Sequence, residues 1–272
     1  YPKYIEANGG TVSQIWNEGD RRLDTMIALM RANPGVKFAE FGTRRRFSSA
    51  WQDHAVERFA AECPANLIGT SNPWLAAKYG IAASGTNAHE LGMTYAALEE
   101  ARGGNPIDGQ AGVIADWLER FPSMPVVLTD TDTTDATLKL MTAEQTEQVM
   151  SYRIDSGNEC EVGEKILHFL LKNGTDPRNR TLFFSNSLTP EKAVALHHYF
   201  EGRIQTAFGT GGNAVNNMGF DSRHNLPGMN TVSKAVDVNG YGTVKLSDDE
   251  GKHTGAARDI ARYKHHISRL AT

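Results

Sequence analysis

The sequence of 272 residues contains few cysteines and no long apolar run, and each absence excludes a class of protein. Cys63 and Cys160 are the only cysteines, too few and too far apart for a disulfide framework or a zinc cluster, so we expect two reduced thiols in a cytoplasmic protein. No apolar stretch approaches the ~18 residues of a membrane span. The start of the sequence is polar and is broken by Pro2, Gly9 and Gly10, so it does not resemble a signal peptide.

An excess of positive charge is also missing. The formal net charge is -4 at pH 7, so the surface as a whole does not attract nucleic acid and any site for anions must be local. The sequence begins with Tyr1 rather than Met, and we therefore expect further residues upstream of it in the native protein.

What the sequence does contain is an alternation of helical stretches with short apolar runs. Apolar residues recur at helical spacing in the first stretch, and Ser48 or Ser49 is expected to cap the second. The same patterns predict helices at 11–32, 47–62, 73–79, 88–102, 107–121, 142–150, 162–173 and 190–200, and strands at 36–41, 66–69, 125–129, 151–154, 181–184 and 204–208.

Strands that alternate with helices indicate an α/β fold with a parallel sheet. The number of strands suits a closed barrel better than an open sheet, although periodicity alone does not decide between them. After Asn216 the pattern changes. We predict a hairpin of Thr231–Val238 and Thr243–Leu246 around an Asn239-Gly240 turn, and then a basic helix, Ala256–Leu270.

Polar residues follow nearly every predicted strand, at the point where parallel α/β folds bind ligands. Backbone N–H groups and hydroxyls can cradle phosphate there, arginines can neutralise it, and carboxylates can take ribose hydroxyls. Singly, each signal is equally typical of a tight turn, a helix cap or a solvated charge run. Their conjunction favours a site for a polyphosphate sugar. The residues concerned are 42–46, 69–72, 85–90, 129–132, 153–158, 185–187 and 209–212.

Six runs of sequence occur in order from about Phe38 to about Lys252 and resemble the bacterial nicotinate phosphoribosyltransferases, which are type II phosphoribosyltransferases. The runs are EFGTRRRFS, GTSN, GTNAHE, RIDSGN, FGTGG and KLSDDEGK. The resemblance implies an irregular (β/α) barrel-like domain over residues 1–217. The hairpin and helix at 218–272 are expected to pack on an N-terminal domain that this sequence lacks.

The family joins nicotinate to phosphoribosyl pyrophosphate, forming nicotinate mononucleotide and pyrophosphate, and hydrolyses ATP to drive the reaction. The resemblance therefore implies ATP and Mg²⁺ as cofactors, while we assign no protein residues to a metal site. Two alternatives stay open. One is an inactive or split module that binds phosphoribosyl groups or nucleotides, and the other is a relative that uses nicotinamide.

The resemblance implies three catalytic residues. His89, in GTNAHE, matches the family's phosphoryl acceptor, and imidazole is a competent nucleophile for this step. Its neighbour Glu90 is expected to orient the ring. Arg153, in RIDSGN, resembles the family residue near the pyridine and the ribose, while Asp155 and Asp130 resemble its ribose- or metal-facing carboxylates.

The remaining residues are implied to bind the substrates. Phe41 matches the aromatic side chain that stacks on the pyridine, and Arg44 is suited to pyrophosphate or carboxylate. Ser71 stands where nicotinamide-using relatives carry Asp, and its hydroxyl can donate to the carboxylate of nicotinate. Three further residues are assigned to phosphate: Ser187, Gly211 and Gly212.

Two departures from the family pattern bear on these assignments. Asn158 and the Ser185-Asn186-Ser187 run stand where the family more often has carboxylates, and their loss is expected to weaken metal or ribose binding. Full-length members also carry an N-terminal region of on the order of 100 residues, which supplies a tyrosine to the pyridine pocket. We therefore expect a homodimer or a complex with a missing N-terminal portion, and no nucleic-acid or membrane partner.

Overall fold

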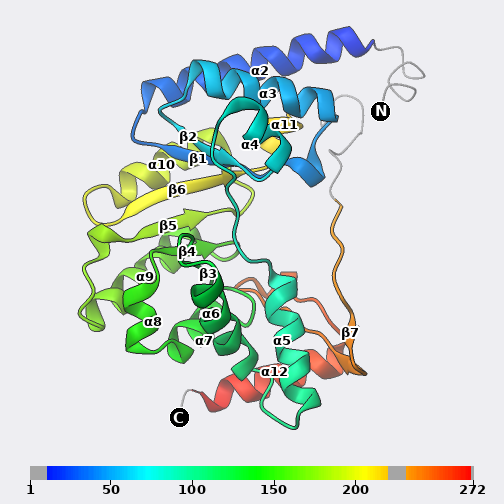
Figure 1. Ribbon diagram of the computed structural model, residues 1–272, viewed down its shortest axis with the longest axis vertical. Helices are drawn as coiled ribbons and strands as arrows, with labels where there is room; N and C mark the ends of the chain where they lie inside the picture. Colours follow the sequence, from blue (N-terminus) through cyan, green and yellow to red (C-terminus); the bar gives the residue numbers. More distant parts are fainter. Residues whose placement is uncertain (1–10, 220–230, 271–272) are drawn as a thin grey trace. The chain divides into compact units, whose positions relative to one another are not determined.

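The computed structural model describes residues 11–219 and 231–270, which form two compact units (Figure 1). Unit 1 comprises Tyr1–Gly85, Ser187–Tyr199 and Thr206–Val232, and unit 2 comprises Thr86–Asn186, Phe200–Gln205 and Ser233–Thr272. The chain passes between the units several times, so neither is a continuous stretch of sequence. The expected domain boundary after residue 217 stays a prediction.

Unit 1 is built on parallel strands with β1 (Lys37–Glu40) in the middle. Its neighbours are β2 (Leu67–Thr70) and β6 (Gln205–Thr210), and Glu40 is in register with Thr70 on one side and Thr210 on the other. The three strands thus end at the same level. The helices of unit 1 are α2 (Val12–Ala32), α3 (Ser49–Glu62), α4 (Pro73–Tyr79), α10 (Pro190–Phe200) and α11 (Gly212–Val215), with a 3-10 turn at Thr43–Arg45.

Local sequence explains where the helices of unit 1 begin. Thr11 and Gln14 form a capping box at the start of α2, and the Ser48 hydroxyl accepts from the Trp51 N–H at the start of α3. The two helices lie side by side (Figure 1), and the rings of Trp16 and Trp51 meet edge to face with centroids 5.0 Å apart. The predicted boundaries of both helices are confirmed to within two residues.

Unit 2 is also built on parallel strands, with β4 (Ser151–Ile154) between β3 (Val126–Leu128) and β5 (Thr181–Phe184). Its helices are α5 (His89–Ala101), α6 (Asp108–Arg120), α7 (Thr134–Leu140), α8 (Ala143–Gln148), α9 (Glu159–Lys172) and α12 (Ala257–Arg269), with 3-10 turns at Pro177–Asn179 and Glu250–Lys252. The sequence patterns missed α7, whose seven residues are polar in every other position and carry no helical stripe.

Helices α5 and α6 pack closely because Gly109 has no side chain. A Cβ on Gly109 would lie 2.4 Å from the Ala96 nitrogen, so any larger residue would push the two backbones apart. Below them, α12 contributes the fully buried Tyr263 to a small apolar cluster with Val244 and Leu246. The segment after the hairpin is therefore anchored in the core of unit 2.

The hairpin is present but shorter than predicted. Its strands are β7 (Asp237–Val238) and β8 (Tyr241–Gly242), and its turn residues Asn239 and Gly240 have φ of 55° and 85°, as a type I′ turn requires. The predicted pairing of 243–246 with 231–238 continues only as far as Thr243, whose N–H donates to the Val236 carbonyl at 3.2 Å, and is wrong beyond it. Instead, backbone N–H groups of Leu246 and Ser247 donate to the carbonyls of Thr131 and Asp130 after β3.

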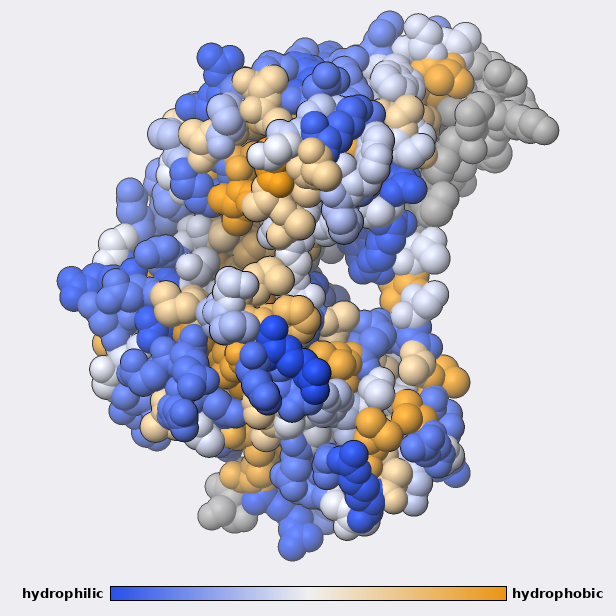
Figure 2. All heavy atoms as spheres, viewed as in Figure 1, coloured by the Kyte–Doolittle hydropathy of each residue, from blue (hydrophilic) through white to orange (hydrophobic). Residues whose placement is uncertain are grey.

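The fold class is confirmed: parallel α/β, with a C-terminal hairpin and helix. Closure of the strands into a barrel stays a prediction. The face seen in Figure 2 is largely hydrophilic, with apolar residues in small groups. Across the described ranges, no helix is both long enough and apolar enough to cross a bilayer.

Candidate active site

The strand ends of unit 1 carry two of the predicted substrate-binding residues on neighbouring strands. The Phe41 N–H, just after β1, donates to the Thr210 carbonyl on β6 at 2.7 Å. On the other side, the Ser71 N–H, just after β2, donates to the Glu40 carbonyl at 2.8 Å. Phe41 and Ser71 therefore follow two adjacent, hydrogen-bonded strands and lie at the same edge of the sheet.

The phosphate residues of unit 1 lie beside the turn that follows Phe41. A Cβ on Gly42 would lie 3.0 Å from the Gly211 carbonyl and closer still to Val215, so only glycine fits between the turn and α11. The Asn213 amide donates to the Leu188 carbonyl at 2.6 Å, which ties α11 to the loop after Ser187. Gly42 belongs to the 42–46 run that the sequence pointed to, but it was given no role of its own.

Three of the predicted residues in unit 1 have free access to solvent or strained backbone. Ser71 and Ser187 are exposed, and Ser187 adopts a φ of 46°, which is uncommon outside glycine. Arg44 is exposed as well, and its Nη1 donates to the Thr231 carbonyl at 2.8 Å. The structure thus brings Phe41, Ser71 and Gly211 to one edge of the sheet, with Arg44 in the adjoining 3-10 turn.

In unit 2, the three predicted catalytic residues lie together with the predicted Asp130 and with Lys245, which was not predicted. We call these five residues, His89, Asp130, Arg153, Asp155 and Lys245, the histidine cluster. His89 is the first residue of α5, and its Nε2 lies 2.8 Å from Asp130 Oδ1. Asp130 has no exposed surface and follows β3 by two residues. Its Oδ2 accepts from the Ser156 hydroxyl at 2.6 Å and pairs with Lys245 Nζ at 3.2 Å.

The environment of Asp130 keeps its carboxylate ionised. Burial by itself would raise the pKa of Asp130. The hydrogen bond and charge of His89, together with Lys245 and Ser156, outweigh burial and hold that pKa well below its ordinary value. A charged acceptor is therefore fixed against one nitrogen of the His89 ring.

Arg153 and Asp155 complete the cluster from the end of β4. Asp155 Oδ2 lies 3.8 Å from His89 Nε2, and its Oδ1 accepts from the Ser185 hydroxyl at 2.6 Å. The Arg153 guanidinium donates to Ser185 at 2.9 Å and to the Thr86 hydroxyl at 2.6 Å, and lies 3.4 Å from Asp155. Asp155 keeps about a quarter of its side chain exposed, at 24%, so it can reach a ligand that Asp130 cannot.

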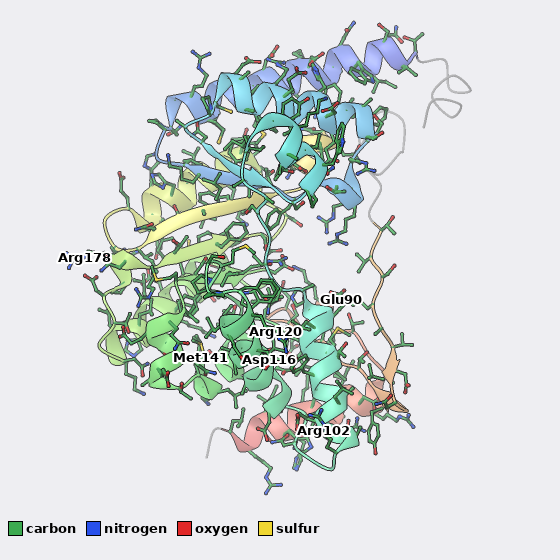
Figure 3. The ribbon with its side chains drawn as sticks, viewed as in Figure 1. Glu90, Arg102, Asp116, Arg120, Met141 and Arg178 are labelled. Atoms are coloured by element: carbon green, nitrogen blue, oxygen red, sulfur yellow. The ribbon has the colours of Figure 1, made fainter. Side chains whose placement is uncertain are left out.

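The carboxylate that orients His89 is Asp130, not Glu90. Successive helical residues point in different directions, so Glu90 turns away from the ring of His89. Its carboxylate pairs with Lys234 Nζ at 2.9 Å, and although burial would raise the pKa of Glu90, this pair lowers it. Glu90 lies at one end of α5, and Arg102 lies just past the other (Figure 3).

The departure at Asn158 has a structural role of its own. Its side-chain oxygen accepts from the N–H groups of Cys160 and Glu161 and caps α9. Asn and Asp are equally good caps, so this position meets a local requirement with either residue. Asn186 accepts from Lys252 Nζ at 3.0 Å, so this second departure also has a hydrogen-bond partner.

Sequence reasoning missed Lys245 and Ser156 as members of the site. Both lie inside quoted motifs, KLSDDEGK and RIDSGN, but nothing in the spacing shows that they converge on Asp130. In the part of the chain that the structure describes, no group of three or more His, Cys, Asp or Glu side chains is arranged to hold a metal ion.

Known proteins resemble this chain in both sequence and structure. Residues 36–268 match the model of the nicotinate phosphoribosyltransferase (NAPRTase) family. A crystal structure of nicotinate phosphoribosyltransferase from Porphyromonas gingivalis is 29% identical with a TM-score of 0.86, over 100% of this chain and 68% of that one. The corresponding structure from Vibrio cholerae is 29% identical with a TM-score of 0.81, over 92% of this chain and 59% of that one. This chain therefore spans only part of the length of either protein.

Proposed function

This chain belongs to the nicotinate phosphoribosyltransferase family, and we propose that it joins nicotinate to phosphoribosyl pyrophosphate, giving nicotinate mononucleotide and pyrophosphate. The proposal includes coupling to ATP hydrolysis through a phosphate carried on His89. One observation supports it most: a buried, ionised carboxylate holds Nε2 of His89 at the strand ends of unit 2.

The hydrogen bond to Asp130 determines which nitrogen of His89 reacts. When Nε2–H donates to Asp130, the lone pair of the neutral ring is on Nδ1. Among the described residues, Nδ1 makes no hydrogen bond. We therefore assign the attack on the terminal phosphorus of ATP to Nδ1: the N–P bond forms as the bond to ADP breaks and ADP leaves, and water later releases the phosphate from His89. Asp130 stabilises the positive charge that develops on the ring.

Asp155 and Arg153 are the residues of the cluster that suit the sugar. Asp155 is partly exposed beside His89, so its carboxylate fits a ribose hydroxyl or the Mg²⁺ that accompanies phosphoribosyl pyrophosphate. When bound, Mg²⁺ would neutralise charge on the leaving pyrophosphate. The Arg153 guanidinium is held by Ser185 and Thr86, so it can meet an anion with little loss of side-chain entropy.

The strand ends of unit 1 suit nicotinate and phosphate. Phe41 can stack on the pyridine ring, and the exposed Ser71 hydroxyl can donate to its carboxylate. Arg44 is suited to pyrophosphate, and the backbone of Gly211 and Gly212 to the 5′-phosphate, with Ser187 on the adjoining loop. The pyridine nitrogen attacks the sugar unprotonated, so the transfer needs no general base.

A direct assay tests this proposal. The chain, alone and with any upstream polypeptide, is incubated with nicotinate, phosphoribosyl pyrophosphate, Mg²⁺ and ATP, and nicotinate mononucleotide is measured. We expect product, stimulation by ATP, and an acid-labile phosphate on His89. His89→Ala should lose the ATP stimulation and the phosphate while keeping the fold by circular dichroism. ATP stimulation that survives in His89→Ala would remove His89 from the mechanism.

Two other functions give different results in the same assay. A nicotinamide-using enzyme would turn over nicotinamide in preference to nicotinate, which the hydroxyl of Ser71 disfavours. A non-catalytic module would bind phosphoribosyl pyrophosphate without forming product. The partner prediction, a homodimer or a complex with an N-terminal portion, is tested separately by the mass of the protein in solution.

A further inference from the structure

Glu40, the last residue of β1, has a carboxylate that is fully buried and is hydrogen-bonded by neutral groups. Its Oε2 accepts from the Thr70 hydroxyl at 2.6 Å and from the Gln52 amide at 2.9 Å, and its Oε1 accepts from the Gly42 N–H. Burial raises the pKa of Glu40 in spite of these bonds. A buried acid of this kind is costly, so a leucine at the end of β1 would serve packing better.

Gln52, from α3, is the second buried polar side chain at this place, with 1% of its surface exposed. Its Nε2 donates to Glu40 and also to the Thr43 hydroxyl at 2.8 Å. Its Oε1 accepts from Arg46 Nη1 at 3.2 Å and from Asn72 Nδ2 at 3.3 Å. The two donors and two acceptor positions of the amide are thus all used, which is the full capacity of the group.

The bonds of these two residues end on two loops. Gly42, Thr43 and Arg46 belong to the turn after β1, which carries Phe41 and Arg44. Thr70 and Asn72 flank Ser71 after β2. Each loop is therefore held through side chains to the same buried pair, in addition to the bond from the Ser71 N–H to the Glu40 carbonyl.

We propose that Glu40 and Gln52 are positioning residues that set the spacing between Phe41 and Ser71, and hence the fit of the pyridine carboxylate between them. The inference rests on the proposed function. Neither side chain has surface open to a substrate, since Glu40 is fully buried and Gln52 is 1% exposed. A fully satisfied polar network holds one geometry where an apolar contact would allow several. A shift of about 1 Å at a binding group is enough to weaken its contact with a substrate.

A purely structural role would give a different kinetic result. Loss of stability alone lowers the fraction of folded enzyme, which lowers the apparent kcat and leaves the KM for nicotinate unchanged. A positioning role raises the KM for nicotinate and leaves the KM for phosphoribosyl pyrophosphate nearly unchanged. The ratio of the two KM values therefore separates the roles.

The test uses Gln52→Met, which keeps the length of the side chain and removes its four hydrogen bonds. We expect the KM for nicotinate to rise about tenfold and the KM for phosphoribosyl pyrophosphate to change by less than about twofold. The matched control is Gln110→Met, on α6 in unit 2. Gln110 is equally buried, and its amide donates to the Leu128 carbonyl. The Gln110→Met variant should have a lower free energy of unfolding and an unchanged KM for nicotinate.

A second pair of variants keeps the proposal testable if Gln52→Met does not fold. Gln52→Glu places two carboxyl groups against each other and should raise the KM for nicotinate. Adding Glu40→Gln restores one acid and one amide with the bond reversed, and should recover part of the loss. A folded, active Gln52→Met with an unchanged KM for nicotinate, or no recovery in the double variant, overturns the positioning role. Absence of product from the parent chain would instead overturn the proposed function.

Discussion

Each unit has a buried carboxylate at or just after the end of one of its strands, Glu40 in unit 1 and Asp130 in unit 2. The two carboxylates differ in the groups that surround them. Glu40 in unit 1 accepts its hydrogen bonds from neutral donors, and burial raises its pKa although these bonds and the charge of Arg46 lower it. Asp130 in unit 2 is equally buried, but it is paired with His89 and Lys245, which lower its pKa. Burial alone therefore does not decide the charge of an acid at a strand end; the charge of its partners does.

This difference matches the chemistry proposed for each unit. An ionised Asp130 can stabilise positive charge on a histidine during phosphate transfer. A carboxyl group that accepts from neutral donors, such as that of Glu40, fixes the positions of its neighbours and contributes little to the electrostatic field. In this proposal, residues of unit 2 stabilise the charge that develops during the reaction, and residues of unit 1 determine the shape of the pyridine site.

Removal of Lys245 takes away a positive charge beside Asp130, and we expect it to lower the free energy of unfolding more than the other changes considered below. Lys245→Met leaves Asp130 buried without its lysine partner, and we expect a loss of roughly 3 kcal/mol in the free energy of unfolding at pH 7. Since the lowered pKa of Asp130 stabilises the folded state above its unfolded pKa of about 3.8, the difference from the parent should narrow as the pH falls below 4.

Urea unfolding at pH 7 and at pH 3.5 measures this effect. Lys165→Met is the control, because Lys165 pairs with Asp135 at 3.0 Å with both side chains more than half exposed. An exposed pair contributes at most about 1 kcal/mol. Equal losses in the two variants would show that the pair of Asp130 and Lys245 does not keep the acid ionised.

Asp132 is a third buried carboxylate. Among the described residues it has neither neutral donors like those of Glu40 nor a lysine partner like that of Asp130. Its side chain is 1% exposed, and within the described residues Oδ1 has no hydrogen-bond partner. Burial raises the pKa of Asp132 from 3.8 to about 7. The folded protein thus keeps a proton that the unfolded chain releases between pH 4 and 7, so stability falls as the pH rises through this range.

Asp132→Asn should remove this slope. We expect equal stability of variant and parent near pH 4, and a gain for the variant on the order of a few kcal/mol above pH 7. Urea unfolding midpoints at pH 4, 5.5 and 8 measure it, with Asp135→Asn on the exposed part of α7 as the control. Parallel pH profiles of Asp132→Asn and the parent would contradict the assignment.

Local signals in the sequence predicted most of the elements. The Ser48 cap, the Asn239-Gly240 turn and the apolar runs of β4 and β5 depend on neighbouring residues only, and each is found where it was expected. The hairpin strands were overestimated because Leu246 and Ser247 donate to the residues after β3, a contact between distant residues that no local pattern contains.

The candidate site was predictable only in part, for the same reason. His89, Asp130 and Asp155 follow strands in recognisable motifs, and the structure brings them together. Gln52 looks like an ordinary polar residue of a helix, and only the tertiary structure shows that its amide is buried. Asn158 was weighed as a lost metal or ribose ligand, whereas its side chain caps α9.

The smallest loss of stability is expected when a neutral donor to Glu40 is removed. Thr70→Val keeps the shape of the side chain and removes one of the donors to Glu40, together with the hydroxyl that accepts from the Asn72 N–H at 3.1 Å. The other two donors remain, so we expect a loss of about 1–2 kcal/mol in the free energy of unfolding. Because no cation is removed, and the acid is less stabilised in its charged form, the loss should be greater at pH 8 than at pH 5. Chemical unfolding at these two values gives the comparison with Lys245→Met directly. A loss as large as that of Lys245→Met would mean that Glu40 depends on one neutral donor as strongly as Asp130 depends on Lys245.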